Sequence, residues 1–129
     1  MSTLKVNNLQ NASGGSNSTP EEIQQGRAKA WVNFNGTSTL TIRDDFNVSS
    51  ITDHGTGDYT VNFSNAISNS NHATFIQGSG NTNGHHCVGF TYYIRTTYSA
   101  SAVSCGFFKL DNSGARADQT IASVGVFGD

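Results

Sequence analysis

Residues 27–36 read RAKAWVNFNG, and this run carries the clearest structural pattern in the chain. Small or apolar residues, among them Ala30, Val32 and Phe34, recur at every second position. This period is typical of a β-strand that buries one face. Trp31 is out of phase with them, so we expect its side chain on the opposite face of the sheet.

The alternation continues to the end of the chain. Asn35-Gly36 favours a type I′ hairpin turn, since both of its central residues need a positive φ angle. A change of parity after Val48 indicates a β-bulge at Ser49-Ser50. Further strands are expected around residues 40–42, 46–51, 59–63, 73–77, 88–94, 102–110 and 121–127. Short strands at this spacing predict an all-β fold, an antiparallel β-sandwich that is jelly-roll-like, with about eight strands in residues 27–129.

The composition agrees with this fold class and excludes several functions. Asn, Ser, Thr and Gly make up 58 of the 129 residues, whereas only 12% of the residues are charged. Helical bundles and coiled coils are therefore not expected. The formal net charge of −2 and the scattered Lys and Arg residues give no reason to bind nucleic acid. No apolar run is long enough for membrane insertion, and the N-terminus lacks a signal-peptide pattern.

Residues 1–26 differ from the rest and are predicted to form an extended N-terminal attachment arm. Its apolar residues Leu4, Val6 and Leu9 are too few to form a core, so we expect them to bind a partner. Residues 11–18 are polar and contain glycine, which is typical of a flexible linker. Thr19-Pro20-Glu21-Glu22 predicts the start of one short helix, with a capping box between Thr19 and Glu22 and a stop at Gly26.

The cysteines and two adjacent histidines leave three interpretations open. A hairpin centred near residue 96 would place Cys87 opposite Cys105. The two thiols would then be free and buried, or joined in a cross-strand disulfide, or shared with His85 and His86 around zinc. The spacing matches no established zinc motif, so no metal or other cofactor is expected.

Candidate catalytic groups are also absent. Asp44-Asp45 and Glu21-Glu22 are adjacent pairs, whereas glycosidase carboxylates face each other across a cleft. His54 and His72 are interpreted as ordinary exposed residues in loops or at strand starts, although one histidine near a trimer axis could bind metal without a sequence motif. We therefore expect no enzymatic activity.

Three aromatic residues are candidates for contact with other molecules: Trp31, Tyr93 and Tyr98. They lie outside the apolar alternation or in a loop. Such side chains could be buried between subunits, stack on sugar rings, or pack within the chain.

Part of the chain resembles a module that recurs in bacteriophage virions, in tail-fibre-like and other structural proteins of marine and cyanobacterial phages. The resemblance rests on residues 26–37, 42–44, 46–53 and 55–63, which include the runs GRAKAWVNFNGT, FNVSSITD and GTGDYTVNF. Residues 4–11, LKVNNLQN, look like the short attachment leader that often precedes the module. No catalytic residues are implied.

The resemblance implies a virion structural protein, assembled in the host cytoplasm and plausible as a homotrimer. Its arm would bind other virion proteins, and the loops 78–86 and 96–101 would face the host for receptor binding. Two alternatives remain open: a capsid decoration or head-fibre protein, and a carbohydrate-binding module that contacts host cell-surface glycans.

Overall fold

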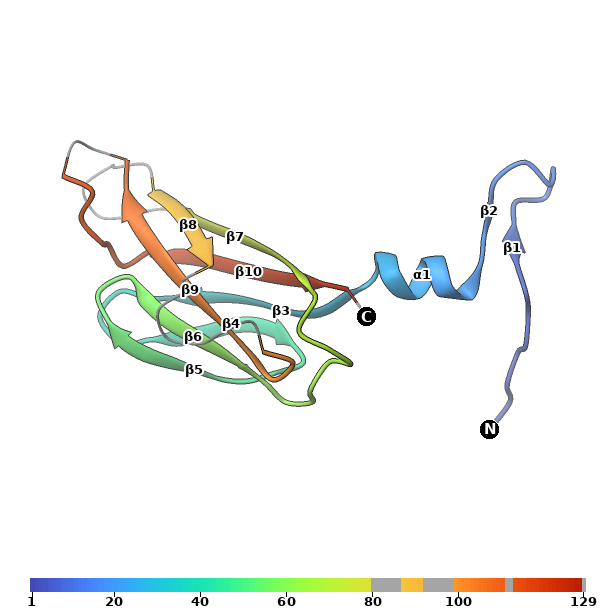
Figure 1. Cartoon of the computed structure of the whole chain (residues 1–129), viewed down its shortest axis with the longest axis horizontal. Helices are drawn as coiled ribbons and strands as arrows, with labels where there is room; N and C mark the ends of the chain where they lie inside the picture. Colours follow the sequence, from blue (N-terminus) through green and yellow to red (C-terminus); the bar gives the residue numbers. More distant parts are fainter. Residues whose placement is uncertain (80–86, 92–98, 111–112, 129) are drawn as a thin grey trace.

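The computed structural model describes residues 1–79, 87–91, 99–110 and 113–128. Within these ranges the chain forms ten strands and one helix (Figure 1). In chain order they are β1 (Leu9–Gln10), β2 (Asn17–Ser18), α1 (Pro20–Gly26), β3 (Ala28–Asn35), β4 (Thr41–Phe46), β5 (Val48–Gly55), β6 (Asp58–Phe63), β7 (Ala73–Ser79), β8 (Cys87–Thr91), β9 (Ala102–Lys109) and β10 (Ile121–Phe127). Strands β3 to β10 form a sandwich, from which α1, β2 and β1 extend as an arm (Figure 1).

Two four-stranded antiparallel sheets make the sandwich. Sheet 1 has the order β4-β3-β10-β7, and sheet 2 has the order β5-β6-β9-β8. Three pairs of consecutive strands are neighbours within one sheet, whereas β4 to β5, β6 to β7, β7 to β8 and β9 to β10 change sheets. The first and last strands of the sandwich, β3 and β10, pair with each other. The prediction of an all-β antiparallel sandwich is confirmed.

The core lies between the sheets, and the alternation in β3 supplies one wall. Ala30, Val32 and Phe34 are buried, as the two-residue period predicts. From the facing sheet, Tyr59 and Phe107 meet Phe34 edge-to-face, with ring centroids 5.2 and 6.3 Å from it. The other buried apolar residues in this cluster are Val48, Val61, Phe63, Ile67, Val103, Cys105, Ala122, Val124 and Val126.

A single residue, Asn47, carries the chain from sheet 1 to sheet 2. Its φ angle is +56°, a conformation that asparagine tolerates better than most residues. The Asn47 side-chain amide donates to the carbonyls of Lys29 and Asn65, both at 3.0 Å. Its oxygen accepts from the Asn65 backbone N–H at 2.9 Å. These bonds hold the crossover, so Phe46 ends β4 and does not share a strand with Val48.

The prediction of the bulge is confirmed, whereas the prediction of the first turn is not. The register of β5 against β6 skips Ser49, which confirms the bulge at Ser49-Ser50. The type I′ turn at Asn35-Gly36 is wrong, because Asn35 pairs with Thr41 and residues 36–40 form a longer loop. In that loop the positive φ angle belongs to Ser38. Gly36 is needed for another reason: a Cβ there would collide with the hydroxyl of Tyr59.

The arm contains more structure than a flexible linker. Leu9 and Gln10 pair with Ser18 and Asn17, so residues 9–18 form a small hairpin. Helix α1 begins with the predicted capping box, in which the Thr19 hydroxyl accepts from the Glu22 N–H and the Glu22 carboxylate accepts from the Thr19 N–H. No residue of α1 is buried.

Candidate functional site

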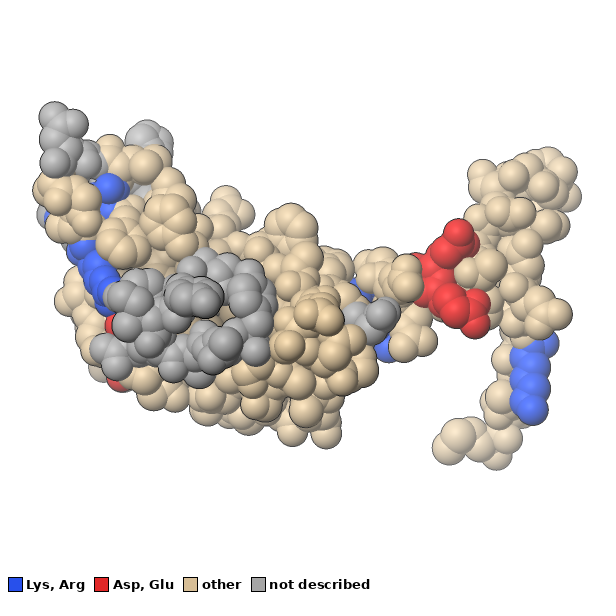
Figure 2. Space-filling view, in the orientation of Figure 1, with Lys and Arg blue, Asp and Glu red and all other residues tan. Residues whose placement is uncertain are grey.

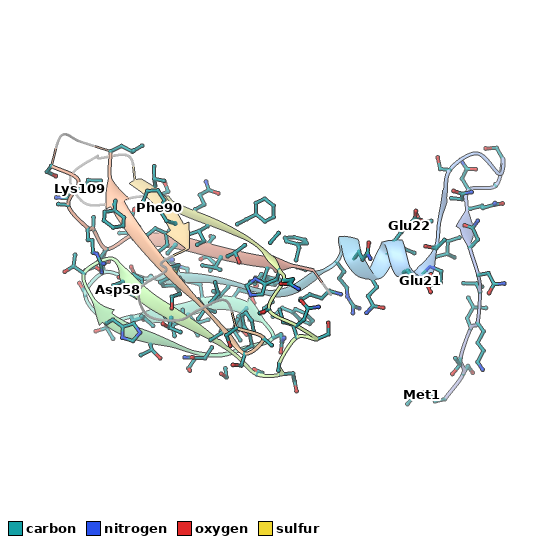
Figure 3. The ribbon with its side chains drawn as sticks, viewed as in Figure 1. Met1, Glu21, Glu22, Asp58, Phe90 and Lys109 are labelled. Atoms are coloured by element: carbon teal, nitrogen blue, oxygen red, sulfur yellow. The ribbon has the colours of Figure 1, made fainter. Side chains whose placement is uncertain are left out.

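The arm presents exposed apolar side chains to solvent. Leu4 is 81% exposed, and Val6 and Leu9 are exposed as well. Ile23 of α1 is a further exposed apolar residue of the arm that sequence reasoning did not single out. A sequence signal for Ile23 does exist: it is an apolar residue in a predicted helix of about two turns, and no segment is predicted to pack on that helix. Glu21 and Glu22, which precede Ile23 in the chain, make an acidic patch on the arm (Figures 2 and 3).

A second unpartnered surface lies on the outer face of sheet 1. Trp31 pairs with Phe46 of β4 on one side and with Gly125 of β10 on the other. Gly125 in turn pairs with Phe75 of β7. These four residues therefore form one row across all four strands, which we call the aromatic row. Phe75 is 65% exposed and Trp31 37% exposed, and Phe46 is also exposed.

The aromatic row borders a shallow groove of about 460 Å³. Trp31 and Phe75 lie on its two sides, and Gly125 lies between them. The ring of Phe127 packs edge-to-face on Phe75, with centroids 5.7 Å apart. The groove is therefore bordered by the rings of Trp31 and Phe75, and Gly125 of β10, which has no side chain, lies between them.

A polar row lies beside the aromatic row on the same face. Its members are paired in the sheet register in the order Gln77, Ser123, Asn33 and Asp44. The Asn33 amide donates to the Ser123 hydroxyl at 2.9 Å. The Arg43 guanidinium donates to the Asn33 side-chain oxygen at 3.4 Å and also to the Thr120 carbonyl. The face thus has an apolar part and a hydrogen-bonding part.

The structure places only some of the predicted contact residues. Trp31 lies on the outer face, as its phase in β3 predicts. Tyr93 and Tyr98 lie outside the described residues, as do most of the loops 78–86 and 96–101. Sequence reasoning did not identify Phe75 and Phe46 as surface residues. Each lies in a short segment, and which side of that segment faces solvent is defined only by its pairing with other strands.

The predicted opposition of Cys87 and Cys105 is wrong. Cys87 of β8 pairs with Lys109, and Cys105 pairs with Thr91. Lys109, which lies opposite Cys87, is four positions from Cys105 along β9, about 13 Å at strand spacing. A disulfide needs Cα atoms within about 7 Å, so this register excludes the disulfide and also a zinc site that uses both thiols. His85 and His86 lie outside the described residues.

Of the two remaining histidines, His54 is exposed as expected, whereas the prediction that His72 is exposed is wrong. His54 Nε2 lies 3.0 Å from the Thr60 hydroxyl. His72 is buried and contacts the Thr74 hydroxyl at 3.1 Å and the Ser99 carbonyl at 3.3 Å. Among the residues that the structure describes, no group of three or more His, Cys, Asp or Glu side chains is placed to hold a metal ion.

One end of the sandwich is held by buried and half-buried polar groups. The Tyr59 hydroxyl lies 2.6 Å from the Asp118 carboxylate, which also accepts from the Gly57 N–H at 2.7 Å. Nearby, the Arg116 guanidinium lies 2.8 Å from the buried Asp58 carboxylate. Burial raises the pKa of the Tyr59 hydroxyl. The hydrogen bond to Asp118 and the negative charge of Asp118 raise this pKa further. This cluster fixes the segment after β9 to the core, a structural role.

Cys105 gives a test of this packing through pH. Burial, and to a lesser extent the charge of Asp58, raises the pKa of the Cys105 thiol from 9.0 to about 12. Above pH 9 only the unfolded state can readily release this proton, so the free energy of unfolding is expected to fall as the pH rises toward 12. Each unit of pH in that window removes about 1.4 kcal/mol per group.

Urea unfolding at several pH values above 8, under reducing conditions, measures this slope. The variant Cys105→Ala should show a shallower decline than the unmodified chain, with Tyr59 supplying part of what remains. Identical slopes in the two proteins would contradict the assignment to Cys105.

The comparisons with known proteins add no constraint on these surfaces. No family model, no curated protein and no solved structure matches the chain. Within the described residues, no helix is long and apolar enough to cross a bilayer.

Proposed function

We propose that this chain is a structural protein of a bacteriophage particle, tail-fibre-like, anchored through its N-terminal arm and presenting the sandwich for assembly or host recognition. The resemblance of residues 26–63 to the virion module supports the assignment to a phage. The observation that carries the anchoring role is the exposure of Leu4, Val6 and Leu9 on an arm without a core of its own.

The physical reason is that the arm gains little stability by itself. A two-stranded ladder of two residues per strand is not stable alone in water, and a seven-residue helix is marginal. A partner that adds a strand to this segment, or accepts its apolar residues in a groove, would provide the missing burial. Such an arm is suited to binding and not to catalysis, and the protein is accordingly proposed to be non-enzymatic.

The arm is tested in the phage that encodes the protein. The triple variant Leu4→Ser, Val6→Ser and Leu9→Ser is expected to lower the amount of the chain in purified particles at least about tenfold, because it removes the apolar contacts of several side chains. Quantitative mass spectrometry of purified particles measures incorporation. Circular dichroism of the isolated protein should show an unchanged sandwich.

The matched control changes three polar residues of the same segment: Lys5→Ser, Asn7→Ser and Gln10→Ser. Normal incorporation is expected for this control. If the apolar variant were incorporated as well as the unmodified chain, the anchoring role of the arm would be excluded.

The position in the particle separates the tail assignment from the capsid alternative. An epitope at the exposed arm or on the sandwich, labelled with gold in intact particles, is expected at the tail. A label on the head would reject the tail assignment and support a capsid decoration or head-fibre protein.

A further inference from the structure

A cavity of about 570 Å³ lies where the arm joins the sandwich, and we call it the junction cavity. One wall is formed by residues 24–29, at the end of α1 and the start of β3, and the facing wall by residues 64–68, after β6. Residues 46–47, at the crossover from β4 to β5, lie between the two walls. Its volume is in the range of cavities that bind ligands in proteins.

The walls of the junction cavity are held in place by hydrogen bonds. The Asn47 side-chain amide donates to the Lys29 carbonyl in one wall and to the Asn65 carbonyl in the other, both at 3.0 Å. The second wall is also tied to the chain before β9, since the Ile67 N–H donates to the Ala100 carbonyl at 2.8 Å. The cavity is therefore preformed, which lowers the cost of binding a ligand there.

The cavity is positively charged. Arg27 and Lys29 line it, and none of its described lining residues is Asp or Glu. The whole chain has only seven Lys and Arg residues, so two of them on one cavity are a marked concentration of positive charge. Figure 2 shows basic side chains where the arm leaves the sandwich. Charges of one sign in a concave site attract ligands of the opposite sign.

The chain itself does not neutralise these two cations. Lys29 Nζ donates to the Gln24 carbonyl at 2.9 Å, which leaves two of its three N–H donors for another partner. The Arg27 side chain is exposed and forms no hydrogen bond or ion pair with the residues that the structure describes. The C-terminus of a helix carries only about half a negative charge. Glu21 and Glu22 lie in the first turn of α1, about 8–9 Å from Arg27 along the helix axis.

Other groups in the cavity also suit an anion. The side chains of Gln24, Ser64 and Ser68 are exposed, and within the described parts of the chain they have no hydrogen-bond partner. Each of them can donate a hydrogen bond. A carboxylate only accepts hydrogen bonds, and it can accept two in parallel from one guanidinium. The exposed ring of Phe46 offers an apolar contact for the methylene groups of an acidic side chain.

The position of the cavity indicates where the carboxylate comes from. The exposed Ile23 lies four residues before Arg27, about 6 Å along the helix axis. Figure 1 shows the arm extending away from the sandwich from this point. A protein that covers the apolar residues of the arm and Ile23 therefore reaches the cavity with its adjoining surface. An acidic group on that protein is delivered to the cavity at a high effective concentration.

We propose that the junction cavity binds a carboxylate side chain from an acidic segment of the protein that holds the arm. This inference rests on the proposed anchoring function and specifies the chemistry of the partner: an apolar groove for the arm, continued by an acidic surface. Arg27 binds the carboxylate through two parallel hydrogen bonds, and Lys29 supplies the second positive charge. Such charge pairs fix the orientation of partners and exclude wrong ones.

Binding of an acidic segment is tested on the full chain by nuclear magnetic resonance. The probe is a hexaglutamate peptide with blocked ends, and hexaglutamine is its uncharged control. Hexaglutamate is expected to shift the backbone amide signals of residues 24–29 and 64–68, and the shifts should shrink in about 0.5 M NaCl because salt screens exposed charges. No shift in these residues, or equal shifts with hexaglutamine, would overturn the site.

Variants of Arg27 separate this site from general attraction by charge. Arg27→Glu should weaken binding of hexaglutamate at least about tenfold, because like charges then face each other. Its circular dichroism should not change, since the Arg27 side chain has no bond to lose among the described residues. Arg27→Lys keeps the charge and should retain most of the binding.

The matched control is Lys109→Glu, which makes the same change of charge at the end of the sandwich opposite the arm (Figure 3). It is expected to leave binding unchanged. Equal weakening by Arg27→Glu and Lys109→Glu would reject a defined site. Shifts produced by polygalacturonate and not by hexaglutamate would also overturn the proposal, and would assign the cavity to an acidic glycan.

Incorporation into phage particles tests the source of the carboxylate. Arg27→Glu is expected to lower the amount of the chain in purified particles about tenfold, and Lys109→Glu should leave it normal. Normal incorporation of Arg27→Glu, with the apolar arm variant still excluded from particles, contradicts this inference alone. Normal incorporation of the apolar arm variant, with Arg27→Glu excluded, contradicts the anchoring role of the apolar residues and leaves the carboxylate site standing.

Discussion

Replacing Phe107 with alanine is expected to lower the free energy of unfolding by about 3–5 kcal/mol. The Phe107 side chain is fully buried, and its ring meets Phe34 and Tyr59 edge-to-face with centroids 6.3 and 6.1 Å away. Alanine leaves a cavity that the surrounding strands cannot close, because all three rings come from paired strands in the middle of the sandwich. Urea unfolding followed by circular dichroism, at one fixed protein concentration, measures the change.

The matched control is Phe90→Ala. Phe90 is 46% exposed and has a ring neighbour in Phe108, at 5.3 Å between centroids. Its loss should cost only about 1 kcal/mol, because about half of the side chain stays in water in the folded chain. Equal destabilisation by the two substitutions would mean that the aromatic trio is not the centre of the core.

The second large effect is expected at Gly57, where alanine should cost about 3–4 kcal/mol. The φ angle of Gly57 is +62°, and a Cβ would lie 2.6 Å from the Phe107 carbonyl oxygen and 2.9 Å from the Ala117 nitrogen. Those two atoms are hydrogen-bonded to each other at 3.0 Å, so neither can move without breaking the bond. The left-handed backbone contributes about 1–2 kcal/mol, and the crowding contributes the rest.

Gly114→Ala separates these two contributions. Gly114 has a similar φ angle of +57°, but an added Cβ there meets no atom within 4 Å. It should therefore show the backbone cost alone, about 1–2 kcal/mol in the same urea experiment. A Gly57 variant no less stable than the Gly114 variant would show that the contact with Phe107 and Ala117 is not restrictive.

The local sequence pattern was sufficient to predict the positions of most strands and the start of the helix. The last strand was predicted over residues 121–127 and observed as Ile121–Phe127, because alternation is a property of the segment itself. The capping box of Thr19 and Glu22 likewise depends on residues three positions apart. The bulge at Ser49-Ser50 was visible as a change of parity.

Pairing between segments could not be predicted in the same way. Cys87 was placed opposite Cys105, four residues from its real partner Lys109, because register depends on the connection between strands and not on their alternation. The prediction of a two-residue turn after Asn35 was wrong for a related reason. Gly36 is fixed by contact with Tyr59, which is distant in the sequence.

The two candidate surfaces differ in the same way: the arm could be predicted from local sequence, and the sheet face could not. The arm was recognised from Leu4, Val6 and Leu9, since a short apolar run without a core is a local feature. On the sheet face, only Trp31 was singled out. Phe46, Phe75 and Gly125 join it only through the register of β4, β7 and β10.

The amino-acid sequence by itself determined the all-β class, the positions of most strands and the character of the arm, because each depends on side chains within a few residues of one another. The tertiary structure alone decided the order of strands in the two sheets, the separation of the cysteines and the row from Phe46 to Phe75. These depend on backbone pairing between segments far apart in the chain, as between β3 and β10, where Ala28 pairs with Phe127. Such bonds use the same N–H and C=O groups at every residue, so the partner is chosen by the packing of the whole core.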